Sequence, residues 1–535
     1  MGICEICVCS SNLPSNGFCL VFHASSCLLR ASLRNYYPRN NYFCPKSPLL
    51  SLYKNLFKQT AIYGLATVFP RMVSFFLVPL YTGLLPIEEY GKVTVIFSWM
   101  IFFNVILAYG METAFFRFYN KETDKKNVVE TAMVSICWTS IVFLGLALVF
   151  RNTLAHYSQI DVQYVTYTIW ILALDALVII PFSKLRATQR PIRYAIIKIG
   201  NVTVNLLLNI FLLVFLPKLA ANSSFFGFLY VPDFQVGYIF ISNIIASLLT
   251  FLVLSPDYLH VNWKIDTDLW KRMLRYGLPI LVAGIAFAIN EQFDKILLGK
   301  LLPENIADSE VGVYSACYKL GLFMVLFRTA YTLGIEPFFF SHANKENATQ
   351  TYATVTKYFV IFGSFIMLAV IVFADLFKML MIRDASYWVA MKVVPLIILA
   401  NFFLGIYTNL SVWYKLIDKT YIGAWISIFG AIVTLALNFL LIPEYSYMGS
   451  AIATIAAYGS MMLLSYFLGR NQYPIPYDIN RIGGYLAISI VFSGVSFYYF
   501  RENYYVGIAL LLVYLYFIYH NEKETLLRII KRKGS

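Results

Sequence analysis

The sequence predicts an all-helical protein that crosses a membrane many times. Of its 535 residues, 59% are hydrophobic and only 13% are charged, unlike the balance in soluble globular domains. Apolar runs of about twenty residues, the length that spans a bilayer as a helix, recur from residue 59 to residue 520. Transmembrane β-barrels are built from short alternating strands instead. A series of motifs that occurs twice further indicates two similar lobes.

We predict about fourteen transmembrane helices. In chain order they cover 59–82, 91–110, 129–150, 160–182, 194–216, 235–254, 276–299, 311–332, 356–381, 387–410, 420–442, 447–469, 482–500 and 504–520. These spans divide the chain into an N-terminal lobe over 50–258, a C-terminal lobe over 259–470, two further helices within 471–520 and a basic tail over 521–535.

Four short motifs occur twice in the same order, once in each lobe. The pairs are Tyr63-Gly64-Leu65 with Tyr276-Gly277-Leu278, Leu84-Leu85-Pro86 with Leu301-Leu302-Pro303, Gly110-Met111-Glu112 with Gly334-Ile335-Glu336, and Asn120-Lys121-Glu122 with Asn344-Lys345-Glu346. Each copy holds six spans, an even number, so both copies enter the membrane from the same side. We therefore predict a parallel repeat, related by a pseudo-two-fold axis along the membrane normal.

The basic residues predict the orientation. The formal net charge is +14, and 29 of the 42 Lys and Arg residues fall in connections on the side of the N-terminus, against five on the other side. An excess of Lys and Arg marks cytoplasmic loops, so both termini are predicted to be cytoplasmic. The positive net charge is then explained by the orientation of the chain in the membrane and by contact with anionic lipids. This distribution argues against nucleic acid as a partner.

Residues 1–49 do not resemble the rest of the chain. They hold six of the eight cysteines, show no sustained periodicity and lack the order of regions that a signal peptide requires. We expect this stretch to be poorly ordered or a non-native extension.

Ionisable residues inside a bilayer mark substrate or ion pathways by default. Arg71 lies near the middle of the first span, and Lys319 and Arg328 lie in the eighth. A buried arginine can also be structural, and Asp175 in the fourth span is the alternative partner that we weigh for Arg71. The functional hypothesis is that the three cations face one cavity and bind an anion.

The seventh span carries four polar residues within two turns, Asn290, Glu291, Asp294 and Lys295. Asn290 and Asp294 share one helical face, while the spacing of Glu291 and Lys295 predicts an ion pair between them. Asn290 and Asp294 then remain as the polar groups that need another partner, and ion coupling is the function that we consider for this group and Asp175.

Glu112 and its repeat mate Glu336 lie at the cytoplasmic ends of the second and eighth spans. We expect them to form a gate through closing contacts with basic residues such as Arg117 or Arg328.

No motif for a soluble enzyme, a cofactor or a metal is present. The five histidines are scattered, and the sequence contains no GxxxxGK[ST] phosphate loop and no HExxH. We predict a protein that is not an enzyme and has no catalytic residue, cofactor or metal.

Several segments resemble one membrane family. They are Asp294-Lys-Ile-Leu-Leu-Gly299, Val311-Gly-Val-Tyr-Ser-Ala-Cys-Tyr-Lys319, Asn438-Phe-Leu-Leu-Ile-Pro443 and Gly449-Ser-Ala451. They look like the polysaccharide-biosynthesis flippases of the multidrug/oligosaccharidyl-lipid/polysaccharide exporter superfamily, over about residues 52–470. The resemblance implies two lobes around a cavity, alternating access, and basic cavity residues at Arg71, Lys319 and Arg328.

The resemblance also implies a substrate and a location. The substrate would be a polyprenyl-diphosphate-linked oligosaccharide, an O-antigen or exopolysaccharide unit, moved across the bacterial cytoplasmic (inner) membrane. Membrane lipids and glycan polymerase machinery would be the partners. Two alternatives share the fold. One is a drug/cation antiporter, which would favour acidic cavity residues. The other is a lipid II-type flippase, because the two C-terminal spans beyond the usual twelve are similar to those of that branch. A third, a glycan polymerase or ligase, would need a large periplasmic loop, and every predicted outer loop is short.

Overall fold

The computed structural model describes residues 64, 66, 68–70, 72–73, 75–342 and 346–533, without the side chains of 336, 337, 340–342 and 524–533. The predicted extension over 1–49 and Arg71 both lie outside the described residues. Within them the chain is helical with short connections, and no strand occurs. The predicted all-helical membrane fold is confirmed.

The N-terminal half begins with an apolar helix, Val68–Leu84, in which residues 71 and 74 are not described. The helices that follow are α2 (Ile87–Ala108), α3 (Met111–Lys121), α4 (Lys125–Val149), α5 (Arg151–Ser158), α6 (Val162–Leu177), α7 (Ile179–Ala187), α8 (Pro191–Ile210), the π-helical turn Phe211–Phe215, α9 (Leu216–Ala220), α10 (Ser224–Leu229), α11 (Gln235–Leu254) and α12 (Pro256–Leu259). Local chemistry sets several boundaries. Gly110, with φ of 72°, separates α2 from α3, and the Asp124 carboxylate caps α4 by accepting from Asn127 N.

The second half is built in the same way. Its helices are α13 (Thr267–Leu301), α14 (Glu304–Tyr318), the 3₁₀ turn Lys319–Gly321, α15 (Leu322–His342), α16 (Ala348–Val372), α17 (Ala374–Met381), the 3₁₀ segment Ala385–Val393, α18 (Val394–Leu410), α19 (Val412–Leu416), α20 (Tyr421–Gln472), α21 (Ile479–Gly494), the π-helical turn Val495–Tyr499 and α22 (Tyr504–Lys533).

In the described part, twelve helices are long and apolar enough to span a membrane. The shorter helix Val68–Leu84 corresponds to the first predicted span, and α20 covers two predicted spans. Backbone angles at Ser446 (φ 48°, ψ −135°) are not helical, and Gly449 lies directly against the Leu441 carbonyl. A continuous helix would separate residues 441 and 449 by about 12 Å, so the chain reverses near Ser446. The number fourteen nevertheless stays a prediction.

Reciprocal contacts relate the two halves. Gly277 approaches Tyr109 O (3.0 Å from an ideal Cβ), and its repeat mate Gly64 approaches Leu333 (3.6 Å), the counterpart of Tyr109. Gly91 lies directly against Asp308, and each follows the proline of a Leu-Leu-Pro motif by five residues. A two-fold axis produces such pairs, because a contact between two positions recurs with the copies exchanged. These contacts agree with the predicted parallel repeat.

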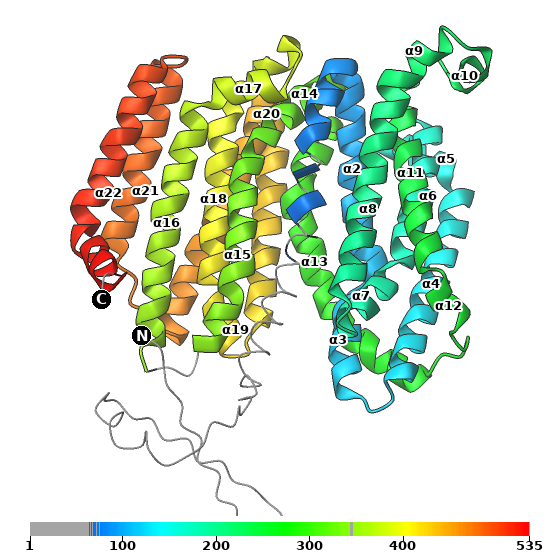
Figure 1. The fold of residues 1–535 in the computed structure, drawn as a ribbon, viewed down its shortest axis with the longest axis horizontal. Coiled ribbons are helices and arrows are strands. Elements are labelled where there is room, and N and C mark those ends of the chain that lie inside the picture. The colour runs from blue at the N-terminus through cyan, green and yellow to red at the C-terminus, as the bar shows by residue number, and fades with distance from the viewer. Residues whose placement is uncertain are drawn as a thin grey trace, which may run out of the picture. The chain divides into compact units, whose positions relative to one another are not determined.

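Helix packing places α13 between the two halves (Figure 1). It packs against α2 and α3 of the first half and against α14 and α20 of the second, and α2 also packs on α14. The last two helices lie apart from this junction, because α21 and α22 pack on α16. The charged residues of α13 therefore lie where the two predicted lobes meet.

Candidate functional site

A cavity of about 450 Å³, called here the central cavity, lies between helices of both predicted lobes. Its walls come from the helix Val68–Leu84, α2, α8, α11, α13 and the α14–α15 junction. The lining combines aromatic rings, amides and charges, in particular Tyr81, Tyr90, Phe97, Tyr318, Asn201, Asn205, Asn243, Glu291, Lys295 and Lys319. A few polar groups set among apolar walls are typical of a ligand site.

Lys319 lines the central cavity and, unlike Lys295, forms no ion pair with a described residue. It lies in the 3₁₀ turn that joins α14 to α15 and is half-buried. Within the described part of the chain, its ammonium has no hydrogen bond, ion pair or ring contact. A half-buried ammonium without a carboxylate partner attracts anions. Arg71, the predicted companion of Lys319, lies outside the described residues, so its place stays a prediction.

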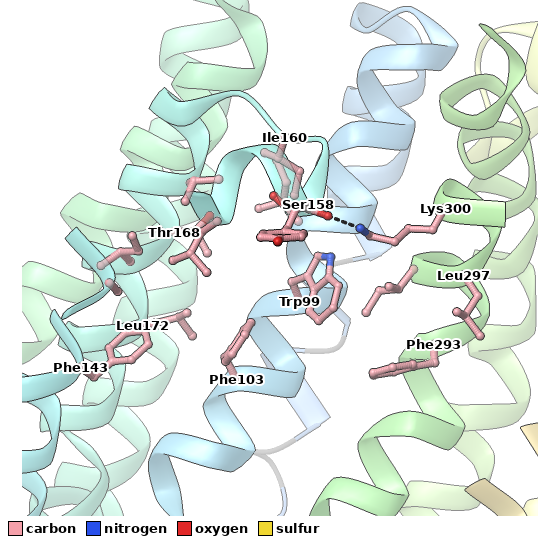
Figure 2. A pocket seen from close by; sticks show the side chains of 17 residues that line it. Trp99, Phe103, Phe143, Ser158, Ile160, Thr168, Leu172, Phe293, Leu297 and Lys300 are labelled. Carbon is pink, nitrogen blue, oxygen red and sulfur yellow. Dashed lines mark hydrogen bonds between the residues drawn. The ribbon is translucent and has the colours of Figure 1, made fainter. Parts of the chain in front are cut away.

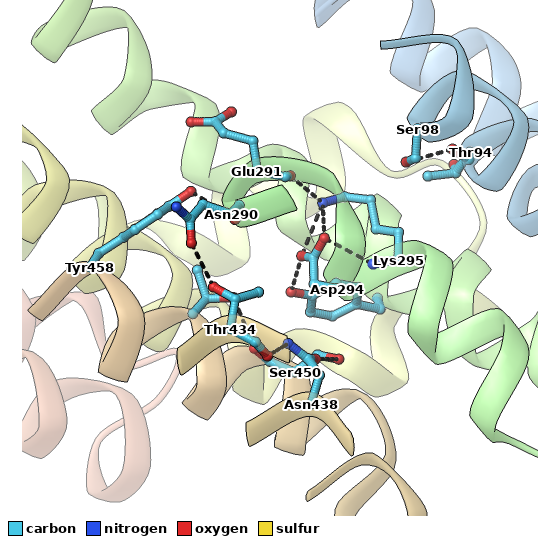
Figure 3. Close-up of polar contacts among 12 residues, drawn as sticks. Thr94, Ser98, Asn290, Glu291, Asp294, Lys295, Thr434, Asn438, Ser450 and Tyr458 are labelled. Carbon is cyan, nitrogen blue, oxygen red and sulfur yellow. Dashed lines mark hydrogen bonds and ion pairs between the residues drawn. The ribbon is translucent and has the colours of Figure 1, made fainter. Parts of the chain in front are cut away.

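Lys295 and Asp294 form a buried ion pair on α13 (Figure 3). The Lys295 ammonium lies 2.9 Å and 3.0 Å from the two Asp294 carboxylate oxygens, and Tyr314 OH donates to the same carboxylate at 2.8 Å. The predicted Glu291–Lys295 pair is therefore wrong. Lys295 reaches only the backbone oxygen of Glu291, at 3.4 Å. The flexible lysine side chain bends to its neighbour because that carboxylate is the more deeply buried.

The Glu291 carboxylate faces Arg328 instead. Arg328 Nη2, on α15, lies 3.8 Å from Glu291 Oε1, and neither side chain is fully buried. Glu291 lines the central cavity, whereas Arg328 is not among the described residues that line it. Of the three predicted anion-binding cations, only Lys319 therefore lies in the wall of this cavity in the described part of the chain.

Asn290 ties α13 to α20 (Figure 3). Its amide donates to Ser427 O at 3.1 Å and accepts from Thr434 Oγ1 at 2.8 Å, and Tyr458 OH donates to its backbone oxygen at 3.2 Å. The hydrogen-bonded chain continues on α20, where Ser450 Oγ donates to Asn438 Oδ1 at 2.9 Å. Asn290 is buried, and the partners that it needs come from α20, within the helix pair.

A second polar cavity, of about 590 Å³, lies among helices of the first half and is called here the N-lobe cavity. Asp175 of α6 lines it together with Lys198, Asn201, Asn243 and Ser247. The Asp175 carboxylate accepts from Ser247 Oγ at 2.7 Å. Asn201 and Asn243 line both polar cavities, which therefore adjoin. The proposed alternative pair of Asp175 with Arg71 involves a residue outside the described part.

The predicted partners of Glu112 are wrong. Glu112 pairs with Arg186 of α7, with Arg186 Nη1 2.7 Å from Glu112 Oε1, and both residues line the N-lobe cavity. Arg117 instead stacks on the Tyr276 ring, 4.2 Å from its centre. Arg186 was overlooked because it lies 74 positions away in the sequence. The side chain of Glu336 is not described, so its predicted role in a gate stays a prediction.

A third cavity, of about 480 Å³, is lined almost entirely by apolar side chains of α2, α4, α5, α6 and α13 (Figure 2). Aromatic rings dominate its wall, among them Trp99, Phe103, Phe143 and Phe293. At one end the Lys300 ammonium donates to the backbone oxygen of Tyr157. This apolar cavity suits hydrocarbon, and it offers a sugar or a phosphate almost no hydrogen bonds.

Sequence reasoning overlooked the asparagines of the fifth and sixth spans. Asn201, Asn205 and Asn209 recur every four residues along α8, and Asn243 faces them from α11. A regular polar stripe in an otherwise apolar helix was the signal that could have revealed them.

Comparison with known proteins agrees with this architecture. The chain shares its fold with the lipid II flippase MurJ in an inward closed conformation (TM-score 0.66, 14% identity, covering 86% of this chain and 99% of that chain). It is also similar to an inward-facing multidrug resistance MATE family transporter of the MOP superfamily (TM-score 0.56, 14% identity, 78% and 95% covered) and to the Vibrio cholerae MATE transporter VcmN in its bent form (0.53, 16%, 83% and 99%).

The family comparison rests on sequence. No curated protein matches the chain. The family described as polysaccharide biosynthesis protein matches residues 56–327, which is just over half of the chain and includes Asp175, Asp294 and Lys319. The chain therefore belongs to the polysaccharide biosynthesis protein family.

Proposed function

We propose that this protein is a flippase that moves a polyprenyl-diphosphate-linked oligosaccharide, an O-antigen or exopolysaccharide unit, across the bacterial cytoplasmic membrane. The observation that carries the proposal is Lys319, an ammonium without a described partner in the polar wall of the central cavity. Membership of the polysaccharide biosynthesis family and a fold shared with a lipid II flippase support the same substrate class.

The physical task explains why such a cavity is useful. A glycan diphosphate carries at least two negative charges and many hydroxyl groups, all costly to expose to hydrocarbon. A polar cavity with a fixed cation replaces part of their hydration, while the polyprenyl chain stays in the surrounding lipid. Alternating opening of the two lobes would then expose the headgroup first on one side and then on the other. Both termini would be cytoplasmic, membrane lipids and glycan polymerase machinery would be the partners, and the role would be transport without catalysis.

A drug/cation antiporter is the second candidate, and one observation favours it. Asp175 places a carboxylate in the N-lobe cavity, where its described hydrogen bond comes from the neutral Ser247 hydroxyl. An acidic cavity group of this kind suits a proton or a cationic substrate. A lipid II-type flippase is a variant of the leading proposal with a different glycan.

The test uses purified full-length protein in liposomes and a fluorescent polyprenyl-diphosphate-linked disaccharide. Lys319→Gln is expected to slow its translocation about 10- to 100-fold, the contribution of a hydrogen bond between charged groups, and Lys319→Arg is expected to retain most of the rate. Lys300→Gln, which removes a cation from the apolar cavity, is the matched control and should leave the rate unchanged.

Two results would argue against the proposal. If Lys319→Gln and the unmodified protein translocate the lipid at equal rates, Lys319 does not bind the headgroup during transport. Transport of an organic cation, abolished by Asp175→Asn and without any lipid translocation, would favour the antiporter instead.

A further inference from the structure

Four asparagines connect the two polar cavities, and they are called here the asparagine ladder: Asn201, Asn205 and Asn209 on α8, and Asn243 on α11. Each primary amide brings two donors and an acceptor into helices that are otherwise apolar. Polar groups at membrane depth are costly unless they are hydrogen-bonded, so each donor and acceptor of the ladder is expected to have a partner.

One end of the ladder is saturated. Asn209 is buried, its amide donates to Asn205 Oδ1 at 2.6 Å, and Tyr81 OH donates to Asn209 Oδ1 at 2.9 Å. Asn205 in turn donates to Asn243 Oδ1 at 2.7 Å. These bonds fix the orientation of the amides, because each oxygen faces a donor.

The other end is open toward the cavities. The Asn201 amide donates to Ala246 O at 3.0 Å and to Thr250 Oγ1 at 2.9 Å, which leaves Asn201 Oδ1 without a bond to the described residues. The bond from Asn205 occupies Asn243 Oδ1 and leaves Asn243 Nδ2 without one. Asn201 and Asn243 both line the central cavity and the N-lobe cavity. Among the described residues, one acceptor and one donor therefore have no partner where the two cavities adjoin.

A free acceptor and a free donor in the wall of the same cavity suit hydroxyl groups, which both donate and accept. The amides are neutral and carry no fixed charge, so this chemistry differs from that of Lys319. Aromatic side chains in the wall of the central cavity, Tyr81, Tyr90 and Phe97, add apolar surface against which the CH groups of a sugar ring can pack. The combination of neutral amides and aromatic rings suits a carbohydrate.

We propose that the asparagine ladder binds the sugar hydroxyls of the transported lipid-linked glycan as the headgroup passes between the central cavity and the N-lobe cavity. This inference rests on the proposed function and adds a recognition site for the sugar that is separate from the cation. The hydrogen bond from the Asn205 side chain orients the Asn243 amide in advance, so the site needs no rearrangement to present its donor.

The alternative is a purely structural ladder that ties α8 to α11, as hydrogen bonds between membrane helices commonly do. The two roles differ in what they predict for a lipid without sugar. A structural defect slows every substrate, whereas loss of a sugar contact slows only the lipid that carries the sugar.

The experiment therefore compares two lipids with the same protein preparation in liposomes: a polyprenyl-diphosphate-linked disaccharide and the same polyprenyl diphosphate without sugar. The doubly substituted variant Asn201→Ala/Asn243→Ala is expected to slow the sugar-bearing lipid about 4- to 140-fold, since each of the two hydrogen bonds contributes a factor of about 2 to 12. The bare lipid should move at an unchanged rate. The ratio of the two rates does not depend on how much of the variant folds.

Ser242→Ala is the control, because Ser242 is buried next to Asn243 in the chain and its one hydrogen bond to the described residues is to Tyr238 O of its own helix. It should change neither rate. Equal slowing of both lipids by the double variant, or no slowing of either, would overturn the ladder proposal alone. If the unmodified protein moves neither lipid, the proposed flippase function fails, and the ladder proposal fails with it.

Discussion

At the scale of single residues, the Asp294–Lys295 pair predicts a specific stability effect. Both side chains are buried, with relative exposures of 2% and 7%. Lys295→Met leaves the Asp294 carboxylate without its counter-charge, and breaking a buried pair in this way costs about 3–5 kcal/mol. We expect a clear fall in the thermal unfolding temperature of the detergent-purified variant. Asp294→Asn combined with Lys295→Met should recover much of it, and a double variant no more stable than the single one would contradict this account.

The same pair shows what the sequence could and could not predict about residues. Composition placed Glu291, Asp294 and Lys295 together in one membrane helix, but the spacing suggested the wrong carboxylate for Lys295. Helical periodicity describes the direction of Cβ atoms, whereas a lysine side chain can bend to either neighbour. The partners of Glu291 and Glu112, Arg328 and Arg186, come from other helices. Such pairings depend on tertiary packing and leave no local pattern.

At the scale of elements, a buried carboxylate ties the last two helices to the rest. Glu522 of α22 accepts from Lys357 of α16 at 2.7 Å and from Tyr485 OH of α21 at 3.3 Å, while its own side chain is 1% exposed. Glu522→Ala leaves Lys357 with its charge unpaired and should loosen α22 from α16. We expect faster hydrogen exchange over residues 504–523 and little change in α13. Glu502→Ala, at a 64% exposed side chain, is the control and should alter neither region.

Long helices were easier to predict than short ones. An apolar run of twenty residues leaves few alternatives in a membrane, so each of the twelve long helices overlaps at least one predicted span. Their ends are less well predicted: α13 begins nine residues before the predicted start at 276, and α16 ends nine residues before the predicted end at 381. Short helices such as α5, α10 and α12 were not predicted, because one or two turns carry no measurable periodicity. Helix α22 continues to Lys533, well past the predicted end at residue 520, since backbone hydrogen bonding does not stop where the apolar pattern stops.

At the scale of the molecule, the repeat was predictable because four motifs occur twice in the same order along the chain. The contact between Gly277 and Tyr109, with its counterpart between Gly64 and Leu333, could not be anticipated from the same motifs. Sequence similarity indicates which positions are equivalent, but not that equivalent positions meet. The close approach at Gly277 joins the junction of α2 and α3 in the first half to α13 of the second, so under the proposed function it is a contact that alternating access must open.

This contact gives the last prediction. A Cβ at Gly277 would lie 3.0 Å from Tyr109 O and 3.3 Å from Gly110 C, so alanine is tight and valine does not fit without separating the two helices. Gly277→Val should therefore favour the state in which α3 and α13 are apart. A cysteine introduced at Thr94, in the central cavity, reports the change through its rate of reaction with an impermeant thiol reagent.

The reagent is applied from the predicted cytoplasmic side, in a background without native cysteines. We expect labelling to be at least several-fold faster in Gly277→Val, since a shift of about 1.4 kcal/mol between the two states changes their ratio tenfold. Gly64→Ala is the matched control in the other copy, because a Cβ there meets Leu333 at an ordinary 3.6 Å, and labelling should stay unchanged. Unchanged labelling in Gly277→Val would mean that the α3–α13 contact does not control access to the cavity. Faster labelling from the opposite side only would reverse the predicted orientation of the whole chain, because the close contact would then lie at the outer surface.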